Sequence, residues 1–149
     1  MRLALYQPDI PQNTGTILRT AACLGIAVDV IGPTGFDMTD RALRRAGLDY
    51  LDHVSIARHA SWELFQVQTT AAQRRILLLS THAETAYFNH TFEPRDVILL
   101  GRESAGVPAH VHDAADVRLR IPMQPGLRSL NIAVAAAMVL GEAVRQARA

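Results

Sequence analysis

Five polar residues that could take part in a reaction lie in three loops, each following a predicted strand. They are Asn13 and Arg19 in the first loop, Glu103 in the second, and Ser129 and Asn131 in the third. A guanidinium group can stabilise a developing oxyanion or hold a phosphate, and amide or hydroxyl groups can orient a substrate. Structural explanations stay open, because Asn13, Ser129 and Asn131 also suit helix caps and Arg19 could be a solvated side chain. Arg19 lies within two turns of a predicted helix start, so its side chain can point back toward the same sheet edge as Asn13.

The loop GRESAG, which begins at Gly101, matches none of the common nucleotide-binding or nucleophile motifs. It has one residue too many before Ser104 for the G-x-S-x-G elbow, and a P-loop is excluded because the chain has no lysine. Gly101 at the end of an apolar run instead indicates close approach of a ligand to the backbone. His110 and His112 lack a third ligand at a suitable spacing, and Cys23 is the only cysteine, so we predict no metal.

Length and composition indicate one globular domain. The chain has 149 residues, of which 49% are hydrophobic and 19% charged, and its net charge is +1. A chain of this length can bury a core without disulfides, so we expect a single domain over residues 1–149. Neither a membrane span nor a signal peptide is visible in the sequence, so we expect a cytoplasmic protein with no membrane partner.

The basic residues are unusual, because all fifteen are arginine. An arginine-biased genome explains this simply, but arginine is also the side chain best suited to bidentate phosphate contacts. Arg41, Arg44 and Arg45 cluster on one predicted helix, which makes them candidates for contacts to an RNA backbone.

Hydrophobic patterning predicts strands that alternate with helices. The predicted strands cover residues 2–7, 27–32, 53–57, 75–81, 96–101 and 117–122. Helices are predicted over 17–24, from 39 to 45 with Gly47 as the stop, over 61–72 with Ser61 as the cap, shortly after 106, and over about 129–148. This alternation predicts an α/β fold, a parallel sheet with helices on both faces. Ligands bind such sheets at the carboxyl ends of the strands, where the three polar loops would meet.

Three segments together resemble the motifs of the knotted SPOUT class of RNA methyltransferases, in the branch that methylates ribose 2′-hydroxyls. They are NTGTILRTA from residue 13, LLGRESAGVP from residue 99 and IPMQPGLRSLNIAVAAAMVL from residue 121. LYQPDIPQNTG and RRAGLDYLDHV are further similar to the single-domain tRNA (cytidine/uridine-2′-O)-methyltransferases. The resemblance implies S-adenosyl-L-methionine as cofactor, a deep C-terminal trefoil knot, and a homodimer that methylates the wobble nucleotide in the anticodon region of leucine tRNA isoacceptors.

The resemblance also implies a role for individual residues. It assigns cofactor contacts to Leu79, Ser80, Gly101, Glu103, Ile121, Met123, Ser129 and Leu130. It assigns the leading catalytic role to Arg19 of the other subunit, with Asn13, Ser129 and Asn131 nearby. Because a guanidinium stays protonated, we expect Arg19 to stabilise the developing alkoxide or to clamp a phosphate, and not to act as a base.

Two other functions remain open from the sequence. One is 2′-O-methylation of a different tRNA or rRNA site, and the other is a small-ligand or RNA-binding α/β module without catalysis. The role of Glu103 is also open, because its carboxylate could hold the loops together or attract the cationic sulfonium of the cofactor.

Overall fold

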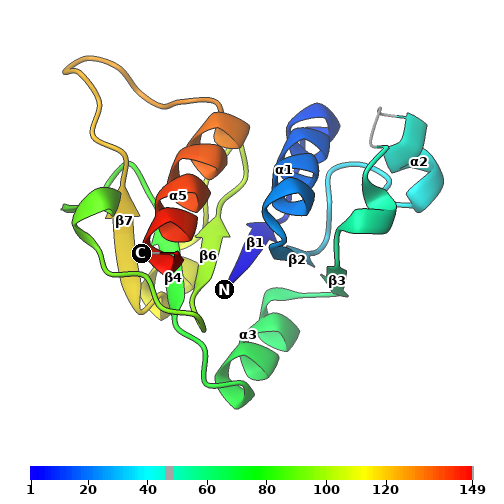
Figure 1. Cartoon of the computed structure of the whole chain (residues 1–149), viewed down its shortest axis with the longest axis horizontal. Coiled ribbons are helices and arrows are strands. Elements are labelled where there is room, and N and C mark those ends of the chain that lie inside the picture. Colours follow the sequence, from blue (N-terminus) through cyan, green and yellow to red (C-terminus); the bar gives the residue numbers. More distant parts are fainter. Residues whose placement is uncertain (46–48, 149) are drawn as a thin grey trace.

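A parallel sheet runs through the middle of the molecule (Figure 1). The computed structural model describes residues 1–45 and 49–148. Within those residues the sheet has seven strands in the order β3-β2-β1-β6-β4-β7-β5, and every neighbouring pair is parallel. The strands are β1 (Arg2–Tyr6), β2 (Ala27–Ile31), β3 (Ile56–His59), β4 (Ile76–Leu79), β5 (Thr85–Ala86), β6 (Val97–Leu100) and β7 (Val117–Arg120). The predicted parallel α/β fold is therefore confirmed.

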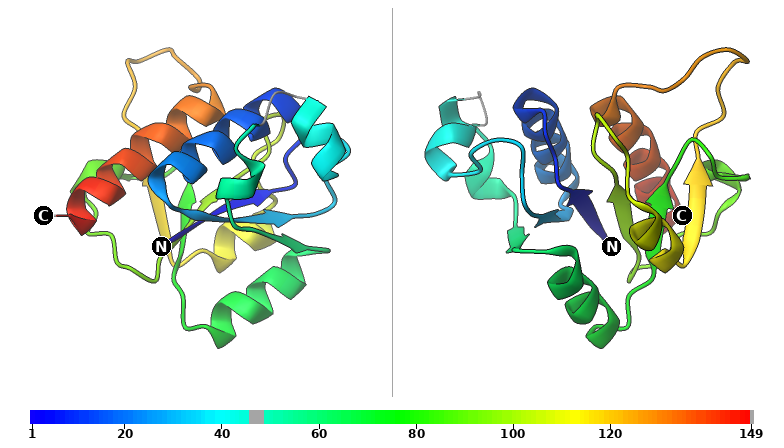
Figure 2. Two further views of the ribbon diagram at one scale, coloured as in Figure 1. Left: turned by 45° about the vertical axis from the view of Figure 1, so that its right-hand side comes forward. Right: turned by 180° about the vertical axis from the view of Figure 1, so that it is seen from behind.

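Helices cover both faces of this sheet. They are α1 (Pro11–Leu24), α2 (Asp40–Arg45), α3 (Trp62–Ala71), α4 (Ala109–Ala114) and α5 (Ile132–Ala147), with the 3-10 turns η1 (Leu51–His53) and η2 (Tyr87–Asn89). Figures 1 and 2 show α1 and α5 side by side on one face, with α3 on the opposite face. No helix in the described part of the chain is both long and apolar enough to cross a membrane.

Alternation along the strands decides which helices each side chain meets. In β1, Leu3 and Leu5 pack in the core beneath α1 and α5, whereas Ala4 and Tyr6 pack with the aromatic residues of α3. All four residues of β6 are buried, as the continuous apolar run in this part of the sequence predicts. The central strands are therefore held from both sides, which fixes the positions of the loops that follow them.

The first half of the chain departs from the sequence expectations in two places. The strand predicted over residues 53–57 is present but starts later, since η1 occupies Leu51–His53 and β3 spans Ile56–His59. The first helix begins at Pro11, well before the predicted residue 17, since proline suits the first turn of a helix. Asn13 therefore lies inside the first turn of α1 and does not cap it.

The later elements follow the sequence more closely. Ser61 caps α3 as predicted, because its hydroxyl accepts a hydrogen bond from the backbone N–H of Leu64. The last helix begins at Ile132 and is capped by Asn131, so Ser129 lies in the preceding loop and is not a cap. Strand β5 has only two residues, too few for a periodic pattern, and was not predicted. Gly47, the expected stop of α2, lies outside the described residues.

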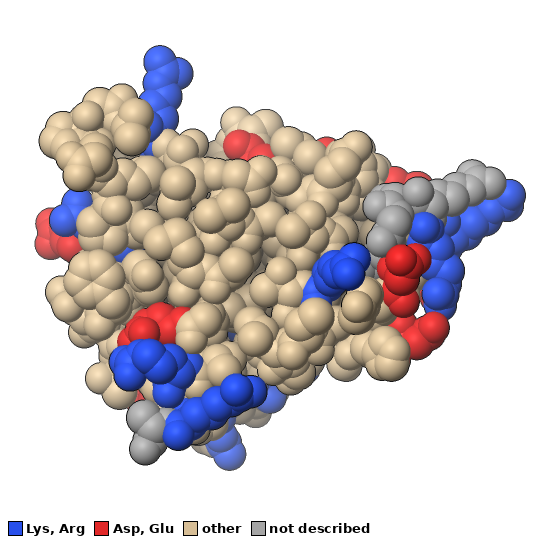
Figure 3. Space-filling view, turned by 45° about the horizontal axis from the view of Figure 1, so that its top comes forward, with Lys and Arg blue, Asp and Glu red and all other residues tan. Residues whose placement is uncertain are grey.

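The outward surface of α1 and α5 carries little charge. Figure 3 shows few charged side chains over the middle of these two helices, whereas charged side chains gather beside α2 and at the C-terminal end of α5, where Glu142 pairs with Arg145. On α5 the side chains of Val134 and Met138 are 49% and 38% exposed. Ala137 and Gly141 are exposed on the same stripe of the helix. The outer side of α5 is therefore apolar and smooth.

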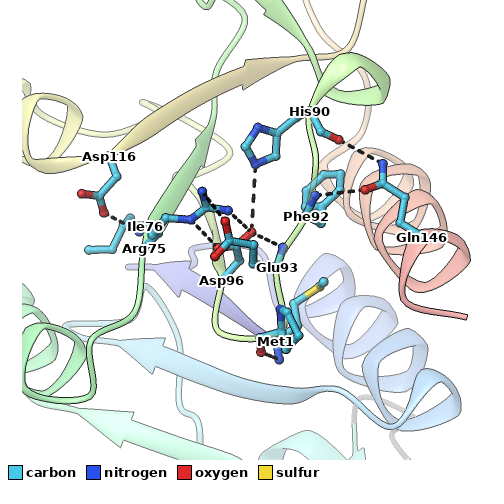
Figure 4. Close-up of polar contacts among 10 residues, drawn as sticks. Met1, Arg75, Ile76, His90, Phe92, Glu93, Asp96, Asp116 and Gln146 are labelled. Carbon is cyan, nitrogen blue, oxygen red and sulfur yellow. Dashed lines mark hydrogen bonds and ion pairs between the residues drawn. The ribbon is translucent and has the colours of Figure 1, made fainter. Parts of the chain in front are cut away.

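A charge network ties together the amino ends of β4 and β6 (Figure 4). The Asp96 carboxylate is fully buried and accepts two hydrogen bonds from Arg75, at 2.8 and 2.9 Å, and one from the backbone N–H of Glu93 at 2.7 Å. The Glu93 carboxylate lies 2.9 Å from Arg75. Asp116 accepts a hydrogen bond of 2.7 Å from the backbone N–H of Ile76. The ends of neighbouring strands are thus joined by side chains as well as by the sheet itself.

Candidate functional site

A pocket of about 730 Å³ lies at the carboxyl ends of β4, β6 and β7, between the loops that follow these strands. All eight residues that the resemblance assigns to a cofactor line this pocket, namely Leu79, Ser80, Gly101, Glu103, Ile121, Met123, Ser129 and Leu130. They meet because β6, β4 and β7 are neighbours in the sheet, although their order in the sequence differs. The carboxyl edge of the sheet is therefore the site, as expected for a parallel α/β fold.

The loop after β6 is closed on itself by its own backbone. Arg102 and Gly106 exchange two backbone hydrogen bonds, at 2.9 and 2.8 Å. A Cβ atom at Gly101 would lie 2.7 Å from the carbonyl carbon of Gly106, and Gly106 has a φ of +63°. The packing of the loop therefore requires glycine at position 101. This reason adds to the one that the sequence suggested, which was close approach of a ligand to the backbone.

Glu103 joins this loop to the one after β1 through Asp9, a residue that the sequence reasoning missed. The backbone N–H of Asp9 donates to Glu103 Oε2 at 3.3 Å, and the Ser104 hydroxyl donates to the Asp9 carboxylate. A hydrogen bond between the two carboxyl groups lowers the pKa of Asp9, and the Ser104 hydroxyl lowers it further. Burial, and then the hydrogen bond to Asp9, raises the pKa of Glu103. This arrangement favours the loop-holding role for Glu103.

Asn13 and Asn131 meet at the rim of the pocket from two different helices. Asn131 Nδ2 donates to Asn13 Oδ1 at 3.0 Å, which connects the first turn of α1 to the start of α5. Asn131 Oδ1 accepts from the backbone N–H of Ala133 at 2.9 Å and so caps α5 at the same time. Both asparagines line the pocket. The capping role and a role in the site are therefore compatible in Asn131.

Arg19 does not reach the pocket of its own chain. Its side chain is exposed, and its guanidinium carbon lies 4.5 Å from the centre of the Tyr50 ring. Arg19 follows Asn13 by six residues, which at 3.6 residues per turn separates the two side chains by about 120° around α1. Within one chain Arg19 therefore lies over Tyr50 and not at the pocket edge where Asn13 lies, although its place near the helix start allowed that arrangement.

The remaining residues near the site are arranged as follows. Ser129 is exposed on the pocket loop, and Arg128 and His112 also line the pocket. In residues 1–45 and 49–148 no group of three or more His, Cys, Asp or Glu side chains is placed to hold a metal ion. Asp9 could have been noticed as a carboxylate that closely follows a central strand. The pocket is thus lined by amides, hydroxyls, backbone and apolar side chains, together with the charged side chains of Arg102, Glu103 and Arg128 and the imidazoles of His82 and His112.

Comparison with known proteins agrees with this geometry. Residues 1–141 match the model of the SpoU rRNA Methylase family. The tRNA (cytidine(34)-2′-O)-methyltransferase of Beijerinckia indica is 58% identical over 144 residues, which is 97% of this chain and 90% of that protein.

Two solved structures extend the comparison. A structure described as giving insights into the 2-OH methylation of C/U34 on tRNA is 40% identical, with a TM-score of 0.90 over 99% of this chain and 91% of that one. The SpoU methyltransferase AviRb from Streptomyces viridochromogenes, in complex with the cofactor AdoMet, is 27% identical, with a TM-score of 0.90 over 99% of this chain and 60% of that one. The chain belongs to the SpoU rRNA Methylase family, and the resemblance of its three motifs to the SPOUT methyltransferases is confirmed.

Proposed function

We propose that the protein transfers a methyl group from S-adenosyl-L-methionine to the ribose 2′-hydroxyl of nucleotide 34 of a tRNA, the position that the relatives' names give. The observation that carries this proposal is the pocket at the carboxyl ends of β4, β6 and β7, lined by all eight residues implied for the cofactor. A volume of about 730 Å³ suits a ligand of this size, since small-molecule pockets measure roughly 300–1,000 Å³.

The chemistry of the pocket fits this cofactor. Leu79, Ile121, Met123 and Leu130 provide apolar surface for an adenine ring, and the tight backbone around Gly101 provides N–H and C=O groups. Bound S-adenosyl-L-methionine supplies an electrophilic methyl group on a sulfonium. Glu103 Oε2 accepts the backbone N–H of Asp9 at 3.3 Å, so we assign Glu103 to holding the two loops together and not to pairing with that sulfonium.

In the proposed reaction the asparagine pair orients the ribose. Asn13 and Asn131 fix each other at 3.0 Å, and Asn131 is held further by its cap of α5. A side chain held in this way keeps its geometry when substrate binds, which favours alignment of the hydroxyl with the methyl group. Ser129 on the neighbouring loop offers a second polar contact.

We further propose that a homodimer completes the site with Arg19 from the second copy. Arg19 does not line the pocket of its own chain, so a second molecule would have to present it. The exposed apolar stripe of α5, with Val134 and Met138, is a surface suited to such an interface. In this arrangement the guanidinium stabilises the developing alkoxide or clamps the adjacent phosphate.

The finer substrate features are part of the same proposal. We propose that the anticodon region of leucine tRNA isoacceptors binds beside α2, where Arg41 is exposed and basic side chains gather (Figure 3). Arg44 there pairs with Asp52 at 2.8 Å, and the side chain of Arg45 lies outside the described residues. We also propose a cytoplasmic location and a single functional unit over residues 1–149. Both are consistent with a tRNA substrate.

We also propose that the C-terminal part is tied in a deep trefoil knot. The chain returns from the edge strand β5 to place β6 between β1 and β4, and then places β7 between β4 and β5. Strands β6 and β7 thus each lie between two strands that come earlier in the sequence, and this order favours threading of one loop through another. Single-molecule stretching of the unfolded chain checks this, because a knotted chain remains shorter than its fully extended length.

The test of the proposed function is methyl transfer to total tRNA. The protein is incubated with tRNA and S-adenosyl-L-methionine labelled in the methyl group, and the labelled nucleoside is identified and mapped. We expect label in a 2′-O-methylated nucleotide at position 34, the position that the relatives' names give. Label at another tRNA or rRNA site would mean that the proposed target, nucleotide 34, is wrong. Binding of the cofactor without any methyl transfer would favour a binding module without catalysis.

A further inference from the structure

Arg19 has an aromatic partner on a segment to which the proposed function assigns no role. Its guanidinium carbon lies 4.5 Å from the centre of the Tyr50 ring, within the range of a cation–π contact. Tyr50 belongs to the segment RRAGLDYLDHV, which runs from residue 44 to residue 54. The two residues are distant in sequence and are brought together by the packing of η1 against α1.

Tyr50 is itself held in place by its surroundings. Its ring is half-buried and packs against the core beneath α1. Its backbone carbonyl accepts a hydrogen bond of 2.9 Å from the N–H of His53, at the start of η1. The His53 ring lies near the Tyr50 ring, with a centroid distance of 6.2 Å. Arg19 therefore rests on an anchored ring and not on a mobile one.

The kind of partner distinguishes Arg19 from other arginines of the chain. Arg44, Arg58 and Arg145 donate to carboxylates at 2.8 to 3.0 Å. Among the residues that the structure describes, Arg19 forms no ion pair with a carboxylate. A carboxylate partner occupies guanidinium N–H groups and offsets the charge, whereas a ring face leaves the in-plane donors and the charge available.

We propose that Tyr50 is a positioning residue for Arg19. The ring restricts the many rotamers of an exposed arginine to one place on the outer side of α1, while the N–H groups stay available for an RNA phosphate or a developing alkoxide. This inference rests on the proposed function, because it gives Tyr50 its role only through the action of Arg19 on the ribose.

The test compares two substitutions of Tyr50 in the full-length protein. Tyr50→Phe keeps the aromatic face, and we expect its kcat on tRNA to stay within about twofold of wild type. Tyr50→Leu keeps apolar packing but removes the ring, and we expect kcat to fall about tenfold while the KM for S-adenosyl-L-methionine is unchanged. Tyr87→Leu is the matched control, since Tyr87 is another half-buried tyrosine packed against the same core, and turnover should be unaffected.

A double substitution separates positioning from a general effect on the fold. If Tyr50 acts through Arg19, Tyr50→Leu lowers kcat no further in an Arg19→Ala background. An equal loss in both backgrounds would overturn the inference, as would a fully active Tyr50→Leu. An inactive wild-type protein would instead contradict the proposed function, so the two failures are distinguishable.

Discussion

At the amino ends of β4 and β6 the Asp96 carboxylate is fully buried and accepts three hydrogen bonds, two of them from Arg75. At the carboxyl ends of the same strands, backbone and side chains surround a pocket of about 730 Å³. The amino end pairs its charges within the chain, whereas the pocket loops leave polar groups facing open space. The comparison indicates that the amino end of the sheet stabilises the fold, whereas the carboxyl end is available for a ligand.

Both ends of the sheet contain buried polar atoms without a hydrogen-bond partner in the described structure, and at the amino end this atom is His90 Nε2, 4.0 Å from the Asp96 carboxylate. Beside the pocket, Asp9 Oδ1 and Arg102 Nε are buried without a hydrogen-bond partner in the described structure. The nearest contact between those two side chains is an ion pair at 3.8 Å. Unpaired buried groups cost stability wherever they lie, so they do not by themselves distinguish the two ends. Because Asp96 is fully buried at the amino end and the carboxyl end opens on the pocket, we expect substitutions at the amino end to change stability and substitutions at the carboxyl end to change ligand binding or turnover.

The largest expected effect is on stability, from Asp96→Ala at the amino end. This change leaves Arg75 and the backbone N–H of Glu93 without their buried acceptor, so we expect the free energy of unfolding to fall by about 3 kcal/mol. Urea denaturation followed by circular dichroism measures it. The control is Asp52→Ala, which removes an exposed ion pair with Arg44 and should cost less than about 1 kcal/mol. Equal losses in the two variants would contradict the buried network as a source of stability.

The next effect is on turnover, from Arg19→Ala. Removal of a donor to a developing oxyanion lowers kcat on tRNA about 100-fold, whereas the Kd of S-adenosyl-L-methionine should change by less than about twofold. Single-turnover methylation and calorimetric titration measure the two quantities. Arg95→Ala is the matched control, because Arg95 lies just before β6 at the amino end, away from the pocket, and donates a hydrogen bond to Gln73. Intact turnover at saturating tRNA would remove Arg19 from the reaction.

A smaller effect is expected in the pocket from Gly101→Ala. The new Cβ would lie 2.7 Å from the backbone of Gly106, so the loop must shift at a cost of about 1–2 kcal/mol. We expect roughly tenfold weaker binding of S-adenosyl-L-methionine, measured by titration. Gly15→Ala provides the comparison, since a Cβ there meets nothing within 4 Å. Unchanged binding in Gly101→Ala would show that the backbone of the loop can shift without changing the cofactor pocket.

Much of this comparison could be predicted from the sequence, because buried strands leave a strong pattern. The apolar runs at β4 and β6 predicted two buried strands, and the loops after these strands contain Gly101, Glu103 and Ser80. The eight pocket residues came from matching motifs, since no periodicity identifies an adenine site. Asn131 was correct as a cap because a short amide before an alanine-rich run is a local signal.

The parts that could not be predicted depend on contacts between distant segments. The Asp9–Glu103 pair joins residues 94 positions apart, and the Arg19–Tyr50 contact depends on how η1 packs against α1. The strand order β6-β4-β7 is equally non-local, because it reverses the order of two strands in the sequence. Local patterns carry no information on such pairings, so the contact of Arg19 with Tyr50 could not be predicted from the sequence.

The smallest expected effect is a pH dependence at the Asp9–Glu103 pair. The folded-state pKa of Glu103 is raised above its ordinary value of 4.5, so its contribution to stability is present below pH 4.5 and is lost as pH rises through the raised pKa. Asp9 has the opposite sign, because its pKa is lowered from 3.8 and its contribution is lost only as pH falls through that lowered value. Glu103→Gln imitates the protonated form, so its stability relative to wild type should increase with pH above 4.5. Urea unfolding of both proteins between about pH 4 and pH 8 measures this difference, and a constant difference would mean that the pKa of Glu103 is the same in the folded and unfolded proteins.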